Sequence, residues 1–110
     1  MGGHWAVWLS QQSDLPIRSA VLYYAARGGS VANSKVSFPA HFADVDLWVR
    51  TTARRRMERA IVAADRPYAA YDYPGTGHWF AESAREHDYN PESAKSAFDR
   101  TLAHLKAVNA

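Results

Sequence analysis

The sequence predicts an α/β fold in which about three parallel strands are flanked by helices. Short apolar runs rich in β-forming residues alternate with longer stretches whose apolar residues recur every three or four positions. The resulting order is helix, strand, strand, helix, strand, helix, and strands separated by helices favour parallel pairing in one sheet. The 110 residues contain no internal repeat and no interdomain linker, so we take them as one domain or part of one.

The first half of the chain predicts one helix followed by two strands. A helix is predicted over residues 3–12, because the two glycines Gly2 and Gly3 are followed at once by an apolar run that ends in a polar stretch. Residues 20–25, AVLYYA, form a continuous apolar run that predicts a strand buried on both faces. A second strand is predicted over residues 36–42, where Pro39 fits an edge strand or a strand start better than a central position.

The second half predicts a helix, a strand and a helix. The apolar residues of segment 49–64 recur at three- and four-residue spacing, which is typical of a helix. Pro67 precedes a third strand over residues 68–73, and Asn90 and Pro91 have the order of an N-cap and a first helical residue. We expect the last helix to bury a stripe formed by Ala94, Ala97, Phe98, Thr101, Leu102, Leu105 and Val108.

Composition narrows the classes of function. The formal charge is only +2, which gives no argument for a nucleic-acid binder in the absence of a patterned basic patch. The sequence contains no cysteine, and therefore neither a disulfide framework nor a thiolate metal site. The longest apolar run is far shorter than a membrane span, and the first residues lack the charged region of a signal peptide. We expect a cytoplasmic protein with no nucleic-acid or membrane partner.

Two polar segments follow the second and third predicted strands. Asp44 and Asp46 follow the second strand, and His78 lies on a glycine-bracketed loop after the third. Because the carboxyl ends of neighbouring parallel strands lie at one edge of a sheet, the two loops should meet there. An acid followed along the chain by a histidine is the order of the triad partners in α/β-hydrolases. In such a triad the histidine takes the proton of the nucleophile, and the carboxylate fixes its tautomer and stabilises the imidazolium.

At these residues the chain resembles the C-terminal half of the dienelactone hydrolase family, within the α/β-hydrolase superfamily. The resemblance runs essentially end to end and rests on four motifs in order: Met1-Gly2-Gly3 before an apolar helix, His41-Phe42 with Asp46 downstream, Tyr73-Pro74-Gly75 with Gly77-His78 and Phe80, and Asp99-Arg100-Thr101-Leu102. It implies the C-terminal part of a three-layer α/β-hydrolase sandwich, with Asp46 as the triad acid and His78 as the triad base. It also implies hydrolysis of a carboxylic ester or lactone bond in a small molecule, without a cofactor.

The resemblance further implies that the nucleophile precedes this sequence. The family's nucleophile elbow reads Gly-x-Ser or Gly-x-Cys followed by x-Gly-Gly, and Met1-Gly2-Gly3 match its last three positions. Residues 1–110 are then a partial domain, truncated just after the nucleophile, with the amide of Met1 as an oxyanion-hole donor. We expect the DNA upstream to encode the missing tripeptide, and the chain by itself to be inactive. The alternative is an inactive remnant or binding module of the same fold.

One position departs from the family pattern and bears on the substrate. In well-known dienelactone hydrolases an arginine four residues after the triad histidine helps to hold the substrate carboxylate, and here that position is Glu82. A carboxylate would repel an anionic lactone, so we expect a neutral ester, lactone or thioester. Trp48 and Trp79 flank the acid and the base and are predicted to wall an apolar substrate pocket together with Glu82.

The other histidines are interpreted as structural or exposed. His4 and His41 stand among apolar residues and are predicted to be hydrogen-bonded structural histidines, whereas His87 and His104 are predicted to be exposed. The histidines lack the spacing of known zinc patterns, so we expect no metal site. The neighbouring aromatic residues are predicted to form core beside the active site: Trp5, Trp8, Tyr23 and Tyr24.

The arginines of the second predicted helix admit two interpretations. A phosphate-binding surface is one, and its affinity for nucleic acid would fall steeply with salt. However, Met57 and Ile61 occupy one helix face and Glu58 can pair with Arg54 or Arg55, which favours a solvated face. This helix contains or adjoins Arg50, Arg54, Arg55, Arg56 and Arg59.

The missing strand predicts a free sheet edge. It would normally pair with residues 20–25, so the isolated chain would expose that edge as a template for self-association.

Overall fold

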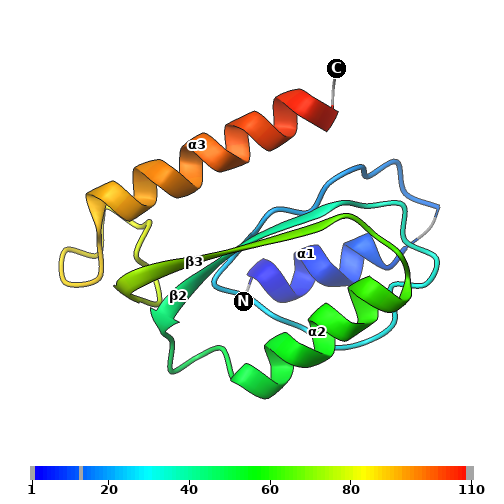
Figure 1. The fold of residues 1–110 in the computed structure, drawn as a ribbon, viewed down its shortest axis with the longest axis horizontal. Helices are drawn as coiled ribbons and strands as arrows, with labels where there is room; N and C mark the ends of the chain where they lie inside the picture. The colour runs from blue at the N-terminus through cyan, green and yellow to red at the C-terminus, as the bar shows by residue number, and fades with distance from the viewer. Residues whose placement is uncertain (1, 13, 109–110) are drawn as a thin grey trace.

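A computed structural model describes residues 2–12 and 14–108 and has the predicted order of elements (Figure 1). The α/β prediction is confirmed: three parallel strands form one sheet with helices beside it. Within the described residues, no helix is long and apolar enough to cross a bilayer. The elements are α1 (Gly2–Ser10), β1 (Leu22–Tyr23), β2 (Phe38–Val45), α2 (Thr51–Ala63), β3 (Tyr68–Gly77) and α3 (Pro91–Val108).

β2 lies between β1 and β3, so Pro39 occupies a central strand and the edge assignment is wrong. Its other predicted place, near a strand start, is confirmed because Pro39 is the second residue of β2. The sheet tolerates this proline because pairing toward β1 is interrupted there. A single bridge joins Ser19 to Ser37, and pairing resumes only at Leu22, opposite Ala40. Pro39 lies between these paired positions, where β2 needs no N–H to donate to β1. Because the pairing is interrupted there, β1 is shorter than the predicted strand.

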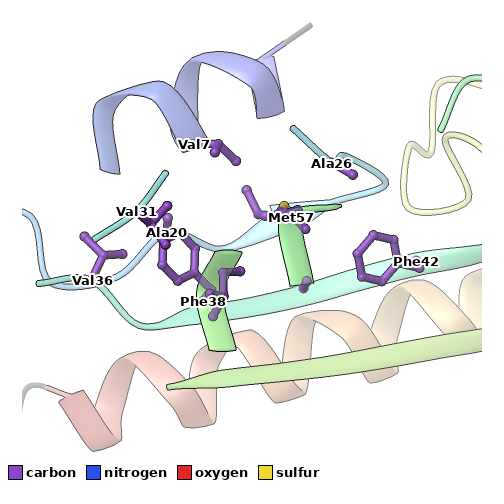
Figure 2. Close-up of a cluster of buried hydrophobic side chains, with 11 residues drawn as sticks. Val7, Ala20, Ala26, Val31, Val36, Phe38, Phe42 and Met57 are labelled. Atoms are coloured by element: carbon purple, nitrogen blue, oxygen red, sulfur yellow. The ribbon is translucent and has the colours of Figure 1, made fainter. Parts of the chain in front are cut away.

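Side chains of β2 alternate between the two faces of the sheet, as the pleat requires. Phe38 and Phe42 belong to the larger core cluster, which also contains residues of α1 and α2, while Ala43 belongs to a smaller cluster that includes Ala97 of α3. Figure 2 shows Val7 and Met57 gathered with Phe38 on the side of the sheet away from α3. The sheet is therefore covered by α1 and α2 on one face and by α3 on the other (Figure 1).

α1 is only partly buried, which corrects the prediction for its tryptophans. Val7 is in the core, but Trp5 is 60% exposed and Trp8 is 39% exposed. The reason is the rotation of the helix about its axis. Its small residues face the strand that ends near Ala25, and a Cβ added to Gly3 would lie 2.1 Å from the Cβ of Ala25. Trp5 and Trp8 project from the opposite side, where their rings contact each other edge to face.

α3 begins as predicted but buries a narrower stripe. The side chain of Asn90 accepts a hydrogen bond from the N–H of Ser93 at 3.0 Å, which is the geometry of an N-cap. Ala97 is fully buried, whereas Phe98 is 61% exposed. The expected burial of Phe98, Leu102 and Leu105 is therefore wrong. The helix meets the sheet through Ala97 and Thr101, and the larger apolar residues lie to one side of that line.

A bulge near the end of β3 carries the chain to the candidate site. Ala43 pairs with Tyr73 and Val45 pairs with Gly77, so β3 has extra residues between two paired positions of β2. Gly75 has a φ of 72°, a conformation that glycine adopts without steric penalty. The strands thus extend further than predicted, to Val45 and Gly77, and the candidate acid and histidine follow their ends directly.

Candidate active site

The structure brings Asp46 and His78 together. Asp46 follows β2, His78 follows β3, and the Oδ2 atom of Asp46 lies 2.7 Å from Nδ1 of His78. Both side chains are largely shielded, being 7% and 16% exposed respectively. An ionised carboxylate only accepts hydrogen bonds, so this contact holds the proton of a neutral imidazole on Nδ1. Nε2 is left as the acceptor, which is the state that a general base requires.

The carboxylate of Asp46 is held in place by its own turn. Its second oxygen, Oδ1, accepts hydrogen bonds from the N–H groups of Trp48 at 2.8 Å and Val49 at 3.2 Å. This local turn is typical of aspartate, whose short side chain reaches the main chain two and three residues ahead. One oxygen is thereby occupied by the main chain, and the other is aimed at the imidazole.

Asp44, the other acid of this segment, serves the bulge instead. Its Oδ2 atom accepts a hydrogen bond from the N–H of Gly75 at 3.0 Å, and its own N–H donates to Oγ1 of Thr76 at 3.2 Å. Asp44 therefore bonds to residues of β3. These bonds replace strand pairing that the bulge interrupts, and they tie the segment before His78 to the end of β2.

Two aromatic residues with unusual backbone conformations pack on the imidazole. The ring centroids of Tyr24 and Trp79 lie 4.8 Å and 4.6 Å from that of His78. Tyr24 has a φ of 40° and Trp79 a φ of 69°, a region that bulky side chains rarely adopt. Such conformations persist where surrounding contacts over-determine them, and they cluster at functional sites. Here both rings pack directly against the imidazole.

A pocket of about 340 Å³ opens beside this imidazole. It lies between the start of α1, the end of β1 and the loop after β3. The residues that line it are Gly2, Gly3, Ala6, Val21, Tyr23, Tyr24, Ala25, His78, Trp79 and Glu82. Trp79 and Glu82, which the sequence analysis assigned to a substrate pocket, are among these residues. Trp48 is exposed and lines, with His78 and Trp79, a smaller cavity of about 190 Å³.

The predicted roles of the other histidines are partly corrected. His41 is a buried structural histidine, as expected, with Nδ1 2.7 Å from the hydroxyl of Tyr73 and Nε2 2.9 Å from that of Thr101. His4 is exposed, because it lies on the outer side of α1. His87 is exposed as predicted, but His104 is half-buried, since α3 places its Nε2 2.8 Å from the hydroxyl of Ser19.

The arginine-rich face of α2 is solvated, apart from Arg54. This side chain bonds both oxygens of Asp72, lies 3.4 Å from Glu58 and stacks 3.8 Å over the ring of Phe42. Hydrogen bonding to Arg54 lowers the pKa of Asp72. Arg54 thus fastens α2 to β3. The exposed members are Arg50, Arg55, Arg56 and Arg59.

Some features of the site lie outside sequence reasoning or outside the described residues. The proposed oxyanion donor Met1 is not among residues 2–12 and 14–108. Within that range no group of three or more His, Cys, Asp or Glu side chains is arranged to hold a metal ion. The stacking of Arg85 over Trp79, at 3.7 Å, was not predicted, because a separation along a loop gives no periodic signal for such a contact.

Comparisons with known proteins agree with this fold. The sequence model of the dienelactone hydrolase family matches residues 1–109. Among solved structures, a provisionally named dienelactone hydrolase from Klebsiella pneumoniae subsp. pneumoniae superposes with a TM-score of 0.71 at 21% identity. The alignment covers 89% of this chain and 45% of that one, so the chain spans less than half of that protein. No curated protein matches the sequence.

Proposed function

Because the chain belongs to the dienelactone hydrolase family, we propose that it carries the acid and the base of a Ser/Cys–His–Asp triad that hydrolyses carboxylic ester or lactone bonds. In this proposal residues 1–110 are part of a larger α/β-hydrolase domain. The nucleophile lies on the segment before Met1, and the Met1 amide helps to bind the oxyanion. The resemblance of Met1-Gly2-Gly3 to the end of a nucleophile elbow supports this assignment.

The contact between Asp46 and His78 carries the proposal. Asp46, held at Oδ1 by two main-chain amides, keeps the proton of His78 on Nδ1. Nε2 then accepts the proton of the attacking hydroxyl or thiol and later returns it to the leaving group. The carboxylate stabilises the imidazolium that forms between these two steps. The packing of Tyr24 and Trp79 limits rotation of the ring, so that Nε2 keeps one direction.

The pocket supports a small uncharged reacting group. It is large enough for a compact ester, lactone or thioester and is walled mainly by aromatic and small side chains. Gly2 and Gly3 at the start of α1 bring main-chain N–H groups to the same space, where negative charge would develop on the carbonyl oxygen. This arrangement is suited to acyl transfer.

The proposal is tested by ester hydrolysis with the complete protein that contains this chain. Replacing His78 with alanine should reduce kcat/KM for a p-nitrophenyl ester by about 10⁴-fold, and Asp46→Asn should reduce it by about 10³-fold or more. The carboxamide has the shape of the acid but cannot stabilise the imidazolium. Both variants should fold, because the two side chains follow the carboxyl ends of β2 and β3 and belong to neither core cluster.

Two exposed residues provide matched controls. His87→Ala and Asp99→Asn remove the same groups at exposed positions that do not line the pocket, and their kcat/KM should equal the unmodified value. Robust hydrolysis by the His78→Ala variant would contradict the proposal. A complete protein that binds small esters without cleaving them would instead favour the alternative, an inactive binding module.

A further inference from the structure

The pocket beside His78 has an uneven charge. Glu82 is the only carboxylate among its lining residues, and no lysine or arginine belongs to that lining within the described part of the chain. The ion pairs formed among residues 2–12 and 14–108 do not include Glu82. Its side chain is exposed toward solvent, so the carboxylate is free to meet a bound molecule.

Aromatic rings complete this negative environment. Tyr24 and Trp79, whose rings pack on His78, line the same pocket, and the face of an aromatic ring attracts a cation through its quadrupole. Trp79 already holds one cation, since the guanidinium of Arg85 lies 3.7 Å from its ring centroid. Arg85 is itself outside the lining. A carboxylate beside two aromatic rings is the chemistry that recognises ammonium groups.

The positive end of α1 does not cancel this preference. Gly2 and Gly3 line the pocket with the N-terminal amides of the helix, but the proposed function assigns these groups to the carbonyl oxygen that becomes negative. Glu82 remains as the charged group available to a substituent away from the reacting carbon.

We propose that this pocket selects esters or thioesters whose substituent carries a positive charge, and that Glu82 is the residue that determines this specificity. A carboxylate-bearing substrate is rejected by repulsion, and a neutral one is accepted with intermediate efficiency. The inference rests on the proposed function for the bond that is cleaved, but the charge preference of the pocket can be measured separately.

The kinetic test uses the complete protein and three p-nitrophenyl esters of equal chain length. Their acyl groups end in trimethylammonium, tert-butyl or carboxylate, and a second set carries the same groups on the alcohol. Only one of the two sets is expected to place its variable group in the pocket. In that set kcat/KM should be about tenfold higher for the trimethylammonium ester than for the carboxylate ester. Glu82→Gln should bring the two within about twofold, and Glu82→Arg should reverse their order.

Glu86→Gln is the matched control, because Glu86 is an exposed carboxylate nearby that does not line the pocket, and it should keep the preference. Equal kcat/KM for cation and anion in the unmodified protein, or a preference that survives Glu82→Gln, would overturn the inference. If the neutral ester is not cleaved at all, the proposed function fails instead. Calorimetric titration with benzyltrimethylammonium then decides the charge preference: affinity lost in Glu82→Gln supports it, and no binding to the unmodified protein overturns it.

Discussion

At the scale of single residues, His41 shows how one side chain can join several elements. It projects from β2, is 0% exposed, and contacts the hydroxyls of Tyr73 on β3 and Thr101 on α3. The hydroxyl of Tyr23 on β1 lies 2.9 Å from the same Thr101. All of the strands and the C-terminal helix therefore share one polar network, buried at His41 and partly buried at Thr101. Because each member satisfies another, removing one leaves an unpaired polar group in the core.

The protonation of His41 should make the protein less stable in acid. Burial, together with the positive charge of Arg100, lowers the pKa of His41 from 6.5 to about 4. Between these values the unfolded chain binds a proton that the folded chain does not, so stability is lost as the pH falls from 6.5 to 4. We expect this residue to account for about 2 kcal/mol of that loss, after allowing for solvent screening of the exposed Arg100.

Urea denaturation at pH 7 and at pH 4 measures this effect. The free energy of unfolding of a His41→Gln variant should fall less between the two pH values than that of the unmodified protein, although the variant is weaker at pH 7. His87→Gln removes an exposed histidine and should follow the unmodified protein. Parallel curves for His41→Gln and the unmodified protein would show that His41 titrates normally.

At the scale of elements, α1 is positioned by the absence of a side chain at Gly3. The helix approaches the end of β1 so closely that a Cβ at Gly3 would lie 2.1 Å from the Cβ of Ala25. Gly2, one residue earlier, has no atom within 4 Å of such a Cβ. Glycine in a helix is unfavourable by itself, so its presence at position 3 reflects packing rather than helix propensity. The same approach brings the start of α1 to the pocket beside His78.

Substitution of the two glycines should therefore have opposite consequences. Gly3→Ala should reduce the free energy of unfolding by about 1–3 kcal/mol through overpacking against Ala25. Gly2→Ala should be neutral or slightly stabilising, because the added methyl group meets nothing. Chemical denaturation of the two variants compares them directly. Ala25→Gly in the Gly3→Ala background should recover part of the loss, and a purely additive double variant would argue against direct contact.

At the scale of the whole molecule, apolar surface is exposed on both sides of the sheet. Trp5, Trp8 and Leu9 are exposed on α1, and Phe98, Leu102 and Leu105 are exposed on α3. β1 and β3 are the two edge strands of the described sheet, with β2 between them. Exposed apolar faces and a free edge are surfaces that proteins normally cover.

The 110-residue chain produced by itself should therefore self-associate. Light scattering after size-exclusion chromatography should give a mass that rises with protein concentration. Val21→Lys, which adds a charge next to the edge strand, should lower that mass if the edge is responsible, and Trp5→Ser should lower it if α1 is responsible. A monodisperse monomer with a cooperative melt at high temperature would contradict this prediction.

The order of the elements was determined by the sequence itself, because the signals for it are local. Apolar spacing predicted α2, the Asn90-Pro91 pair predicted the start of α3, and the runs before Asp46 and His78 predicted strands that end at one edge. These signals depend on the conformational preferences of neighbouring residues, so they can be recognised without knowing which distant segments are in contact. The proximity of Asp46 and His78 followed from them, since adjacent parallel strands leave few other places for the two loops.

Burial and the choice of partners were decided only by the tertiary structure. The rotation of α1 exposes Trp5, and the line of contact of α3 buries Ala97 and half-buries His104 in place of Phe98. These outcomes depend on which surface of a helix meets the sheet. The spacing of apolar residues in α1 and α3 is compatible with more than one buried surface. Pro39 was accepted in a central strand because β1 does not pair there. Each case is settled by contacts between segments distant in the sequence, whose free energies no local pattern contains.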